Sequence, residues 1–412
     1  MCKRILLITQ YFYPENFKSN DIAFELVKRG YEVDALVGIP NYPEGKYFDG
    51  YGLFKKRHEV IKLSTGSSQV EVNVYRAFQT PRGKGGWRLP INYFSYVISA
   101  SLWVLFKFAW KKYDCIIGHE PSPIFQAYPA ILLRSIRKIP FYYWILDLWP
   151  PSIMNNPKGI MSRLAVKMVQ KQVRFIYKRC DKTLISSRLF EKHILAYGGN
   201  NCQIEYFPNW SDDMLLGEKK ELNIALPNGF IIMMAGNLGD SQDLESVSKL
   251  ILELNDIKEL KWVFVGDGSK RQWLDRFIIE HQLSDTCFAV GRHPYSMMPS
   301  FFAKADAMLL SLKAASKQLD SVVPARLQSY MSAAKPVFAM IGTGGADVIK
   351  EADAGCCAAP GDYKGLAEQI RVALQNRDDL QKKGESGRSF FELHFTKEKC
   401  ISNLCRIIND KR

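Results

Sequence analysis

The sequence lacks the residue spacings that build zinc sites and disulfide frameworks. Its nine cysteines include no C-x-x-C pair and are odd in number, so we expect reduced thiols in a cytoplasmic protein. It also lacks a D-x-D motif, which would support a metal–diphosphate clamp, and a Gly-Lys-Ser/Thr motif of the Walker type. We therefore predict no metal site and no resident cofactor.

The first residues do not form the apolar core of a signal peptide. After Met1-Cys2-Lys3-Arg4 the apolar stretch is only Ile5 to Thr9, which predicts a strand instead. The longest apolar segment is Ile91 to Ala109, and its single charge is Lys107. Its length is sufficient to span a membrane, but it contains an asparagine and three serines. We favour a helix in or on a membrane-facing domain; a spanning helix and a plain core helix are the alternatives.

Acidic residues are scarce in the N-terminal half. Residues 1–210 carry 30 Lys/Arg against 15 Asp/Glu, whereas residues 211–412 carry 26 against 27. The excess positive charge of the chain, +14, therefore lies in the first half. Such asymmetry predicts an anionic partner, either phospholipid, nucleic acid or a phosphorylated substrate. The composition, 47% apolar and 24% charged, is typical of a globular protein with sizeable cores.

Part of this charge recurs at helical spacing. At about 100° per residue, five basic side chains fall within roughly an 80° sector of one helix. They are Arg163, Lys167, Lys171, Arg174 and Lys178. This pattern is typical of helices at anionic membrane surfaces, and we interpret it so; a solvated helix face is the alternative. Nucleic acid is the less favoured partner because a known nucleic-acid motif and interleaved stacking aromatics are missing.

The succession of apolar runs predicts an α/β protein with two doubly wound, Rossmann-like domains. Residues Arg4–Thr9, Asp21–Arg29 and Tyr31–Val37 predict a strand, a helix and a strand, which is the unit of a parallel sheet. The pattern restarts with a strand at Phe230–Ala235 and a helix at Leu244–Glu253. Ligands bind such sheets beyond the carboxyl ends of the strands.

The predicted domain limits follow from these runs. We place an acceptor-side domain at 1–208, a polar linker at 209–220 and a nucleotide-sugar domain at 221–390. We expect residues 391–412 to form a C-terminal helix that packs back on the N-terminal domain.

Short motifs follow the predicted strands in a fixed order. They are Tyr11-Phe12-Tyr13-Pro14-Glu15-Asn16, Gly38-Ile39-Pro40-Asn41-Tyr42-Pro43-Glu44-Gly45, His119-Glu120-Pro121, Asp147-Leu148-Trp149-Pro150, Ala235-Gly236-Asn237-Leu238-Gly239 and Val323-Pro324-Ala325-Arg326-Leu327-Gln328-Ser329-Tyr330. With these motifs the chain resembles bacterial family-4 glycosyltransferases of the GT-B fold, whose two Rossmann-like domains face each other across a cleft. It looks most like the subgroup that builds surface polysaccharides such as O-antigen and capsule with N-acetyl-fucosamine-type sugars.

The turn after the strand at 230–235 is the first donor-side candidate. Its glycines, Gly236 and Gly239, precede a helix, so the backbone N–H groups of the turn could face a diphosphate. A tight strand-to-helix turn is the alternative. Members of the resembling family commonly carry Arg at the position of Asn237 and Lys at that of Gln242, and this chain has neither. The negative charge of the donor therefore needs another partner.

Arg326 is the candidate for that charge, because a guanidinium suits phosphate oxygens and the surrounding stretch is apolar. A salt bridge to Asp320 or a solvent-facing helix start is the alternative. The family's two Glu residues fall near Ser321 and Ser329, so uncharged groups replace them. The remaining donor-side candidates implied by the resemblance are Gly266, Gly268, Arg292, Pro324, Gln328 and Ser329.

On the acceptor side, His119 and Asp147 are the catalytic candidates. The resemblance places His119 beside the reacting sugar, where an imidazole stabilises the transition state; a structural histidine is the alternative. Asp147 ends a predicted strand and either binds acceptor hydroxyls or caps a turn. The acceptor-binding candidates are Glu15, Asn16, Asn41, Tyr42 and Glu120.

The resemblance implies a retaining, metal-independent transferase on the inner face of a bacterial membrane. It would move a sugar, N-acetyl-fucosamine or a related N-acetyl-hexosamine, from a nucleotide donor, in the first place a UDP-linked one. The acceptor would be a polyprenyl-pyrophosphate-linked saccharide. A sugar-nucleotide epimerase of the same fold, a non-catalytic membrane- or nucleotide-binding protein and a degenerate, inactive transferase are the alternatives.

Overall fold

The computed structural model describes residues 3–65, 68–83, 87–151, 160–200, 202–313 and 320–410. The chain divides into two compact units. The first unit joins Met1–Phe207 with Ile401–Arg412, and the second is Pro208–Cys400. The segment 209–220, which the sequence predicts to be a linker, lies in the second unit.

The first unit is built on an eight-stranded sheet. Its strands are β1 (Arg4–Ile8), β2 (Glu32–Gly38), β3 (His58–Thr65), β4 (Ser68–Ala77), β5 (Cys115–Glu120), β6 (Phe141–Ile145), β7 (Lys182–Ile185) and β8 (Ile204–Tyr206). Their order is β3-β4-β2-β1-β5-β6-β7-β8, and every pair except β3–β4 is parallel. The first strand, β1, therefore lies in the middle of the sheet; β2 to β4 extend the sheet to one edge, and β5 to β8 extend it to the other. The topological switch point lies between β1 and β5.

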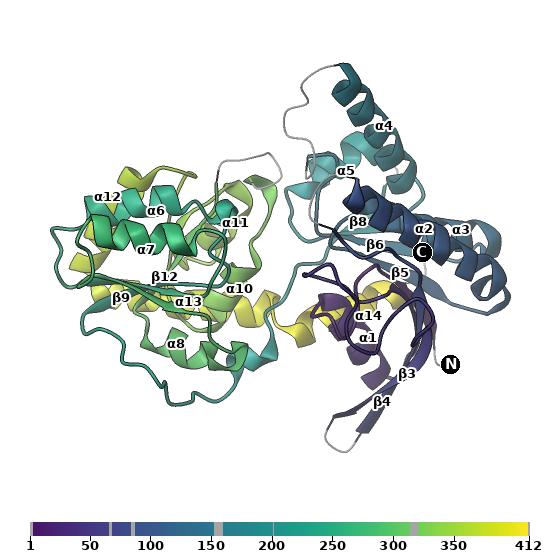
Figure 1. The fold of residues 1–412 in the computed structure, drawn as a ribbon, viewed down its shortest axis with the longest axis horizontal. Coiled ribbons are helices and arrows are strands. Elements are labelled where there is room, and N and C mark those ends of the chain that lie inside the picture. Colours follow the sequence, from purple (N-terminus) through teal and green to yellow (C-terminus); the bar gives the residue numbers. More distant parts are fainter. Residues whose placement is uncertain are drawn as a thin grey trace. The chain divides into compact units, whose positions relative to one another are not determined.

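Helices cover both faces of this sheet. They are α1 (Lys18–Lys28), α2 (Arg88–Phe106), α3 (Tyr128–Arg137), α4 (Ile160–Tyr177), α5 (Phe190–Gly198) and α14 (Lys397–Asn409). Figure 1 shows α2 and α3 on one side of the sheet, and α1 and α14 on the other. The last helix is tied to the first unit at its end, where Lys182 Nζ lies 2.9 Å from Asp410 Oδ2 and Lys3 Nζ donates to Ile408 O at 2.8 Å.

The second unit carries a six-stranded parallel sheet. Its strands are β9 (Phe230–Ala235), β10 (Leu260–Val265), β11 (Cys287–Gly291), β12 (Ala307–Ser311), β13 (Val337–Met340) and β14 (Gly355–Ala358). The order β11-β10-β9-β12-β13-β14 is that of a dinucleotide-binding sheet, with its switch point between β9 and β12. Its helices are α6 (Leu244–Glu253), α7 (Arg271–Glu280), α8 (Met298–Lys304), α10 (Ala325–Ser332), α11 (Thr343–Glu351), α12 (Tyr363–Gln375) and α13 (Arg377–His394).

The core of the second unit forms two apolar layers, one on each face of its sheet. Side chains alternate along a strand, so Ile231 and Met233 of β9 join one layer and Ile232 and Met234 join the other. The first layer is closed by residues of α8, α10, α11 and α13, and the second by residues of α6, α7 and α12. This alternation explains why β9 is apolar at every position: both of its faces are covered.

The predicted α/β class with two doubly wound domains is confirmed. The strand β9 and the helix α6 have the predicted bounds, whereas α1 begins three residues before the predicted Asp21. The hairpin of β3 and β4 was not predicted from the sequence. Within the C-terminal residues 391–412, the expected helix is α14 (Lys397–Asn409), and α13 ends before it at His394.

The apolar segment 91–109 forms most of α2 and the short turn that follows it. Among the described residues, Arg88–Trp110 is the one helix long and apolar enough, by length and composition, to cross a membrane. One face of α2 nevertheless lies on the sheet, with Tyr96, Ala100 and Val104 fully buried. Its contacts with β2 and β4 fix the helix along the first unit.

Candidate functional site

A cleft of about 970 Å³ opens at the carboxyl ends of β9, β10 and β11. Its volume suits a ligand the size of a sugar nucleotide. Five of the predicted donor-side residues line it, namely Gly236, Asn237, Gly266, Gly268 and Arg292. His293, Pro294, Tyr295 and Met298 complete the opposite wall. The glycines lie where the sequence predicts, in turns directly after strands.

The backbone of the turn after β9 differs from the expectation that its N–H groups face a diphosphate. The N–H of Gly236 donates to Val265 O at 2.8 Å, and that of Leu238 donates to Asp267 O at 2.9 Å. The N–H of Gly239 donates to the side-chain oxygen of Gln242 at 3.0 Å. These three N–H groups already have hydrogen-bond partners within the protein. The turn therefore forms part of the cleft wall, but these N–H groups are not free to bind an anion.

Arg326 lies against the same turn. Its Nη2 donates to the carbonyl oxygen of Asn237 at 2.6 Å, and its Nη1 is buried without a hydrogen-bond partner among the described residues. The guanidinium packs on Gly236, where an added Cβ would lie 2.9 Å from Arg326 Nε. An orphaned donor on a fixed cation suits a phosphate oxygen. The salt bridge to Asp320, which the sequence left open as the alternative, does not form among the described residues; Asp320 accepts from Thr343 N at 3.1 Å.

Other cations near the turn are already paired. Lys270 Nζ lies 2.8 Å from Glu245 and 3.3 Å from Asp240, and Lys313 Nζ lies 3.3 Å from Glu245. The hydrogen bond from Lys270 lowers the pKa of Glu245 to about 2. Arg292 is exposed in the cleft wall and has no ion-pair partner within the described part of this unit. Arg292, in the cleft wall, and Arg326, against the turn, are therefore the arginines at this site without an ion pair among the described residues.

The predicted residues around Arg326 have mainly structural contacts. Gln328 is buried, and its amide can donate to Pro324 O at 2.9 Å and to Ala325 O at 3.1 Å, so Gln328 and Pro324 fix the start of α10. Ser329 is half-buried and donates to Ala325 O at 3.3 Å. Tyr330 ends the motif 323–330 but was not among the predicted site residues; its hydroxyl lies 3.1 Å from Ala235 N and 3.2 Å from Ala235 O. It anchors α10, and with it Arg326, to the end of β9.

In the first unit, His119 lies at the switch point between β1 and β5. Its Nδ1 is 3.4 Å from the hydroxyl of Thr9, and its ring packs 5.1 Å from that of Trp144. The Nε2 atom has no hydrogen-bond partner among the described residues. The side chain is 1% exposed, and burial lowers its pKa to about 3. The imidazole is therefore neutral near pH 7 and can offer a hydrogen bond, but it does not carry charge there.

This burial predicts that His119 does not titrate through the physiological range. Its folded-state pKa lies below the usual 6.5, so the ring gains a proton only as the pH falls toward about 3. In spectra of protein labelled with ¹⁵N-histidine, one imidazole should keep neutral-form shifts from about pH 8 to pH 5 while exposed histidines titrate. His119→Gln should remove that signal. A midpoint between about pH 6 and 7 for the signal lost in the variant would contradict the assignment.

Glu120 and Asp147 connect the ends of β5 and β6. The carboxylate of Glu120 is fully buried and accepts from Leu146 N at 3.3 Å and from Asp147 N at 3.2 Å. Burial, followed by the nearby Asp147 charge, raises the pKa of Glu120 well above its usual range. Glu120 thus holds the strand ends together through Oε2, while its buried Oε1 has no hydrogen-bond partner among the described residues. Asp147 is half-buried at the carboxyl end of β6.

Glu15 has a similar role in the loop after β1. It is 3% exposed, and its carboxylate accepts from Asn41 N at 2.7 Å and from Tyr42 N at 2.6 Å. Burial raises the pKa of Glu15 to about 7. The Asn41 side chain is also buried, donating to Ile39 O at 2.8 Å. Of the predicted acceptor residues, Tyr42 and Asn16 are the exposed ones, so they are the better candidates for ligand contact.

The structure adds neighbours that sequence reasoning missed. Tyr42 packs against Tyr11 and Phe17, and the Arg82 guanidinium lies 5.2 Å from the Tyr42 ring centroid. Beneath them, the Gln10 amide donates to Gln79 at 2.9 Å and to Asn92 at 2.8 Å. Amides inside apolar stretches are the signal that would have identified this network, since buried polar groups need partners.

The five predicted basic residues Arg163, Lys167, Lys171, Arg174 and Lys178 are exposed. The first four lie on α4, and Lys178 follows its last residue. Arg174 also lies 5.3 Å from the Tyr197 ring centroid. Within the described residues, no group of three or more His, Cys, Asp or Glu side chains is placed to hold a metal ion.

Comparison with known proteins agrees with this architecture. Residues 218–390 match the family model described as group 1 glycosyl transferases. The chain is 22% identical over 410 residues to WcaI of Escherichia coli (strain K12), named as a colanic acid biosynthesis glycosyl transferase, covering 94% of this chain and 93% of that protein.

Solved structures extend the likeness to the whole chain. Sucrose-phosphate synthase from Thermosynechococcus elongatus has a TM-score of 0.68 at 15% identity and covers 98% of both chains. HepE from Anabaena, solved with UDP, has a TM-score of 0.65 at 14% identity, covering 98% of this chain and 99% of that one. The predicted GT-B architecture is confirmed at the level of the fold. The chain therefore has the GT-B fold, and the part of it that is similar to group 1 glycosyl transferases, residues 218–390, lies in the second unit.

Proposed function

We propose that this chain transfers a sugar from a UDP-linked donor to a lipid-linked saccharide in bacterial surface polysaccharide synthesis. The observation that carries the proposal is the cleft beyond β9–β11, which Arg292 lines. Arg326 does not line the cleft itself but packs on its turn residues Gly236 and Asn237, and its buried Nη1 has no partner among the described residues. A nucleoside diphosphate supplies the anionic oxygens that such a guanidinium lacks. WcaI is named for colanic acid biosynthesis, and HepE was solved with UDP and with UDP-glucose, which supports both the process and the base.

In this proposal the donor diphosphate lies over the turn after β9. Arg326 and Arg292 neutralise the charge that develops as the bond between sugar and phosphate breaks. The protein has no carboxylate at Ser321 or Ser329 to bind the sugar, so uncharged hydrogen bonds replace it. That arrangement is compatible with an N-acetyl-hexosamine such as N-acetyl-fucosamine, whose amide can exchange neutral hydrogen bonds.

The chemistry proposed is transfer with retention and without a metal ion. The leaving diphosphate assists the incoming hydroxyl on the same face of the sugar, and the protein contributes position and electrostatic stabilisation. His119, neutral at pH 7, offers a hydrogen bond to the sugar rather than acting as a charged base. Asp147 is the remaining carboxylate at the carboxyl end of β6 for an acceptor hydroxyl.

The acceptor proposed is a polyprenyl-pyrophosphate-linked saccharide at the cytoplasmic face of the membrane. The exposed basic residues of α4 support this assignment, since each contributes about 1 kcal/mol near an anionic bilayer. The first unit, which bears them, is also the unit with the excess of positive charge.

The test is a transfer assay on the purified full chain. UDP-linked sugars, with GDP- and dTDP-linked sugars beside them, are incubated with lipid-linked saccharides, and products are followed by mass spectrometry and by NMR of the new anomeric centre. We expect a UDP-sugar to be consumed only with acceptor, to give the retained anomer and to be unaffected by EDTA. Conversion of the donor without acceptor would identify an epimerase instead. Binding of nucleotide without any product from any donor would favour a non-catalytic protein.

A further inference from the structure

We infer that α2 is an interfacial membrane helix, whose exposed apolar stripe enters one leaflet of an anionic bilayer while its opposite face stays on the sheet. The stripe is defined by six residues: Trp87, Ile91, Phe94, Ile98, Leu102 and Leu105. The inference deepens the proposed function, since it rests on an acceptor that lies in a membrane. Its test measures lipid binding alone, so the two proposals can fail separately.

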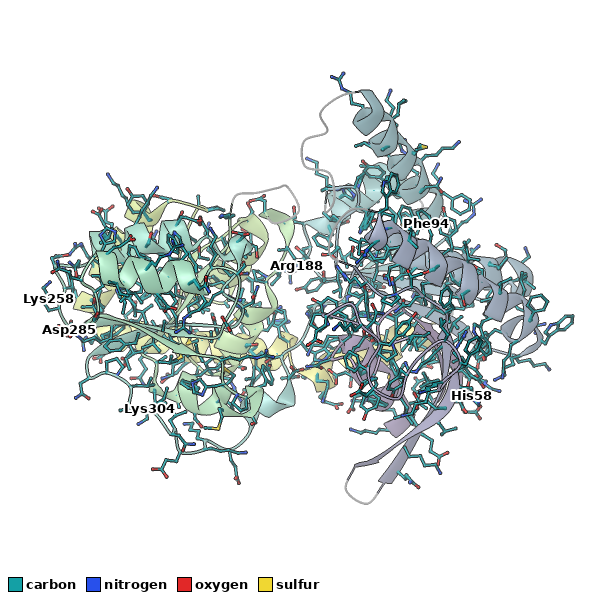
Figure 2. The ribbon with its side chains drawn as sticks, viewed as in Figure 1. His58, Phe94, Arg188, Lys258, Asp285 and Lys304 are labelled. Atoms are coloured by element: carbon teal, nitrogen blue, oxygen red, sulfur yellow. The ribbon has the colours of Figure 1, made fainter. Side chains whose placement is uncertain are left out.

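The stripe follows the period of a helix. Its members are spaced by four or three residues, which places them within roughly an 80° sector at about 100° per residue. Their exposed fractions run from 42% for Leu105 to 82% for Trp87, and Phe94 is labelled on this helix in Figure 2. The exposed Phe106 and Trp110 continue the apolar surface beyond the last turn. A contiguous apolar surface of this kind marks an interaction site.

The opposite face of α2 is fixed by polar contacts to the loops that follow β1 and β4. The hydroxyl of Ser99 accepts from Phe78 N at 2.7 Å, and that of Ser95 accepts from Thr80 N at 2.9 Å. Asn92 accepts from Gln10 and donates to Thr80 O. If α2 crossed a bilayer, it would leave these buried groups of the first unit unpaired, at a cost of about 1–3 kcal/mol each. The helix is therefore built to lie in the interface rather than to span.

Charge identifies the occupant as an anionic membrane. Residues 72–113 contain seven Lys/Arg and no Asp/Glu. Two of the seven are neutralised within the unit, the buried Arg76 by Glu59 and Lys111 by Asp34, which leaves five. The Phe94 ring stacks on Phe125 of the 3-10 turn Ile124–Ala127, with centroids 5.8 Å apart, and that turn contacts α4. This turn therefore links α2 to α4, the helix that carries the exposed basic residues. A second copy docked symmetrically would bring this positive region against itself, whereas anionic headgroups would neutralise it.

The fluorescence of two tryptophans can show how α2 is oriented relative to the membrane. Trp87 and Trp110 lie at the two ends of the segment and are 82% and 81% exposed. In a helix parallel to the membrane both indoles reach the same depth, in the region that tryptophan prefers. In a spanning helix they would lie at opposite interfaces. Vesicles brominated at the outer leaflet only can distinguish these cases through the loss of fluorescence in Trp87→Phe and Trp110→Phe variants.

The experiment is flotation of the full chain with vesicles of neutral phosphatidylcholine and with vesicles that also contain phosphatidylglycerol. The test variant is Ile98→Gln with Leu102→Gln. The matched control is Ile279→Gln with Val372→Gln, two residues of the second unit that are 71% and 63% exposed. We expect wild type and control to float with anionic vesicles, the test variant to bind at least tenfold more weakly, and outer-leaflet bromide to quench both tryptophans.

Several outcomes would overturn the inference. One is equal flotation of the test and control variants; another is quenching of only one tryptophan, which would indicate a spanning helix. A lipid-free dimer that the test variant converts to a monomer, measured by light scattering, would assign the stripe to a second copy instead. UDP binding by the test variant, measured alongside, shows that the chain is folded, and vesicle binding without sugar transfer would overturn the proposed function alone.

Discussion

Replacing Arg326 with alanine is expected to weaken UDP binding by about ten- to a hundredfold. A hydrogen bond between a charged group and its partner contributes about 1.5–3 kcal/mol, and 1.4 kcal/mol corresponds to a factor of ten in affinity. Arg326 already holds Asn237 O through Nη2, so its free Nη1 is oriented before the ligand arrives. Isothermal titration calorimetry with UDP measures the change directly.

The controls separate binding from folding. Arg326→Lys keeps the charge but loses the planar fork, so its affinity should fall between those of wild type and the alanine variant. Arg371→Ala removes an exposed arginine of the same unit, 2.6 Å from Asp256, and should leave UDP binding unchanged. If Arg326→Ala binds UDP as tightly as Arg371→Ala does, the diphosphate is not held by Arg326 and the donor site must be reassigned.

The local sequence pattern was sufficient to predict the strands and helices whose residues all lie in one kind of environment, such as a strand covered on both faces. The strand β9 is apolar at all six positions because helices cover both of its faces, and glycines bound it on either side. The alternation of such runs with helical segments also predicts the doubly wound class, but not the order of the strands. The hairpin of β3 and β4 escaped prediction because its strands mix polar and apolar residues. Its place at the sheet edge depends on pairing with β2, about 40 residues away in sequence.

The sequence predicted where the residues of the candidate site lie in the fold, but not the hydrogen bonds that they make. Glycine-rich turns and a histidine after a strand can be read from spacing, and the structure places them at the carboxyl ends of strands. Hydrogen-bond partners cannot be read in this way. The N–H of Gly239 is taken by Gln242, and the carboxylates of Glu15 and Glu120 bind backbone N–H groups of neighbouring loops. These contacts depend on side-chain orientation after folding, which sequence spacing does not determine.

The close approach of two turns makes glycine necessary at position 266, in the wall of the cleft. It has a φ of +140°, and an added Cβ would overlap the carbonyl oxygen of Gly236. Because that oxygen belongs to the backbone of the neighbouring turn, it cannot move without displacing the wall of the cleft. We expect Gly266→Ala to destabilise the second unit by about 3 kcal/mol or more, from the positive φ and the overlap together.

Gly291 provides the matched control for this overlap. It also ends a strand of the same sheet with a positive φ, +83°, but the atom nearest to an added Cβ is Arg271 Nη1 at 3.7 Å. Gly291→Ala should therefore cost only the backbone penalty, about 1–2 kcal/mol. Hydrogen–deuterium exchange in increasing urea, resolved by peptide, measures both variants, with peptides of the first unit as internal reference. Equal losses of protection in the two variants would show that positive φ alone, and not the contact between the turns, makes glycine necessary at Gly266.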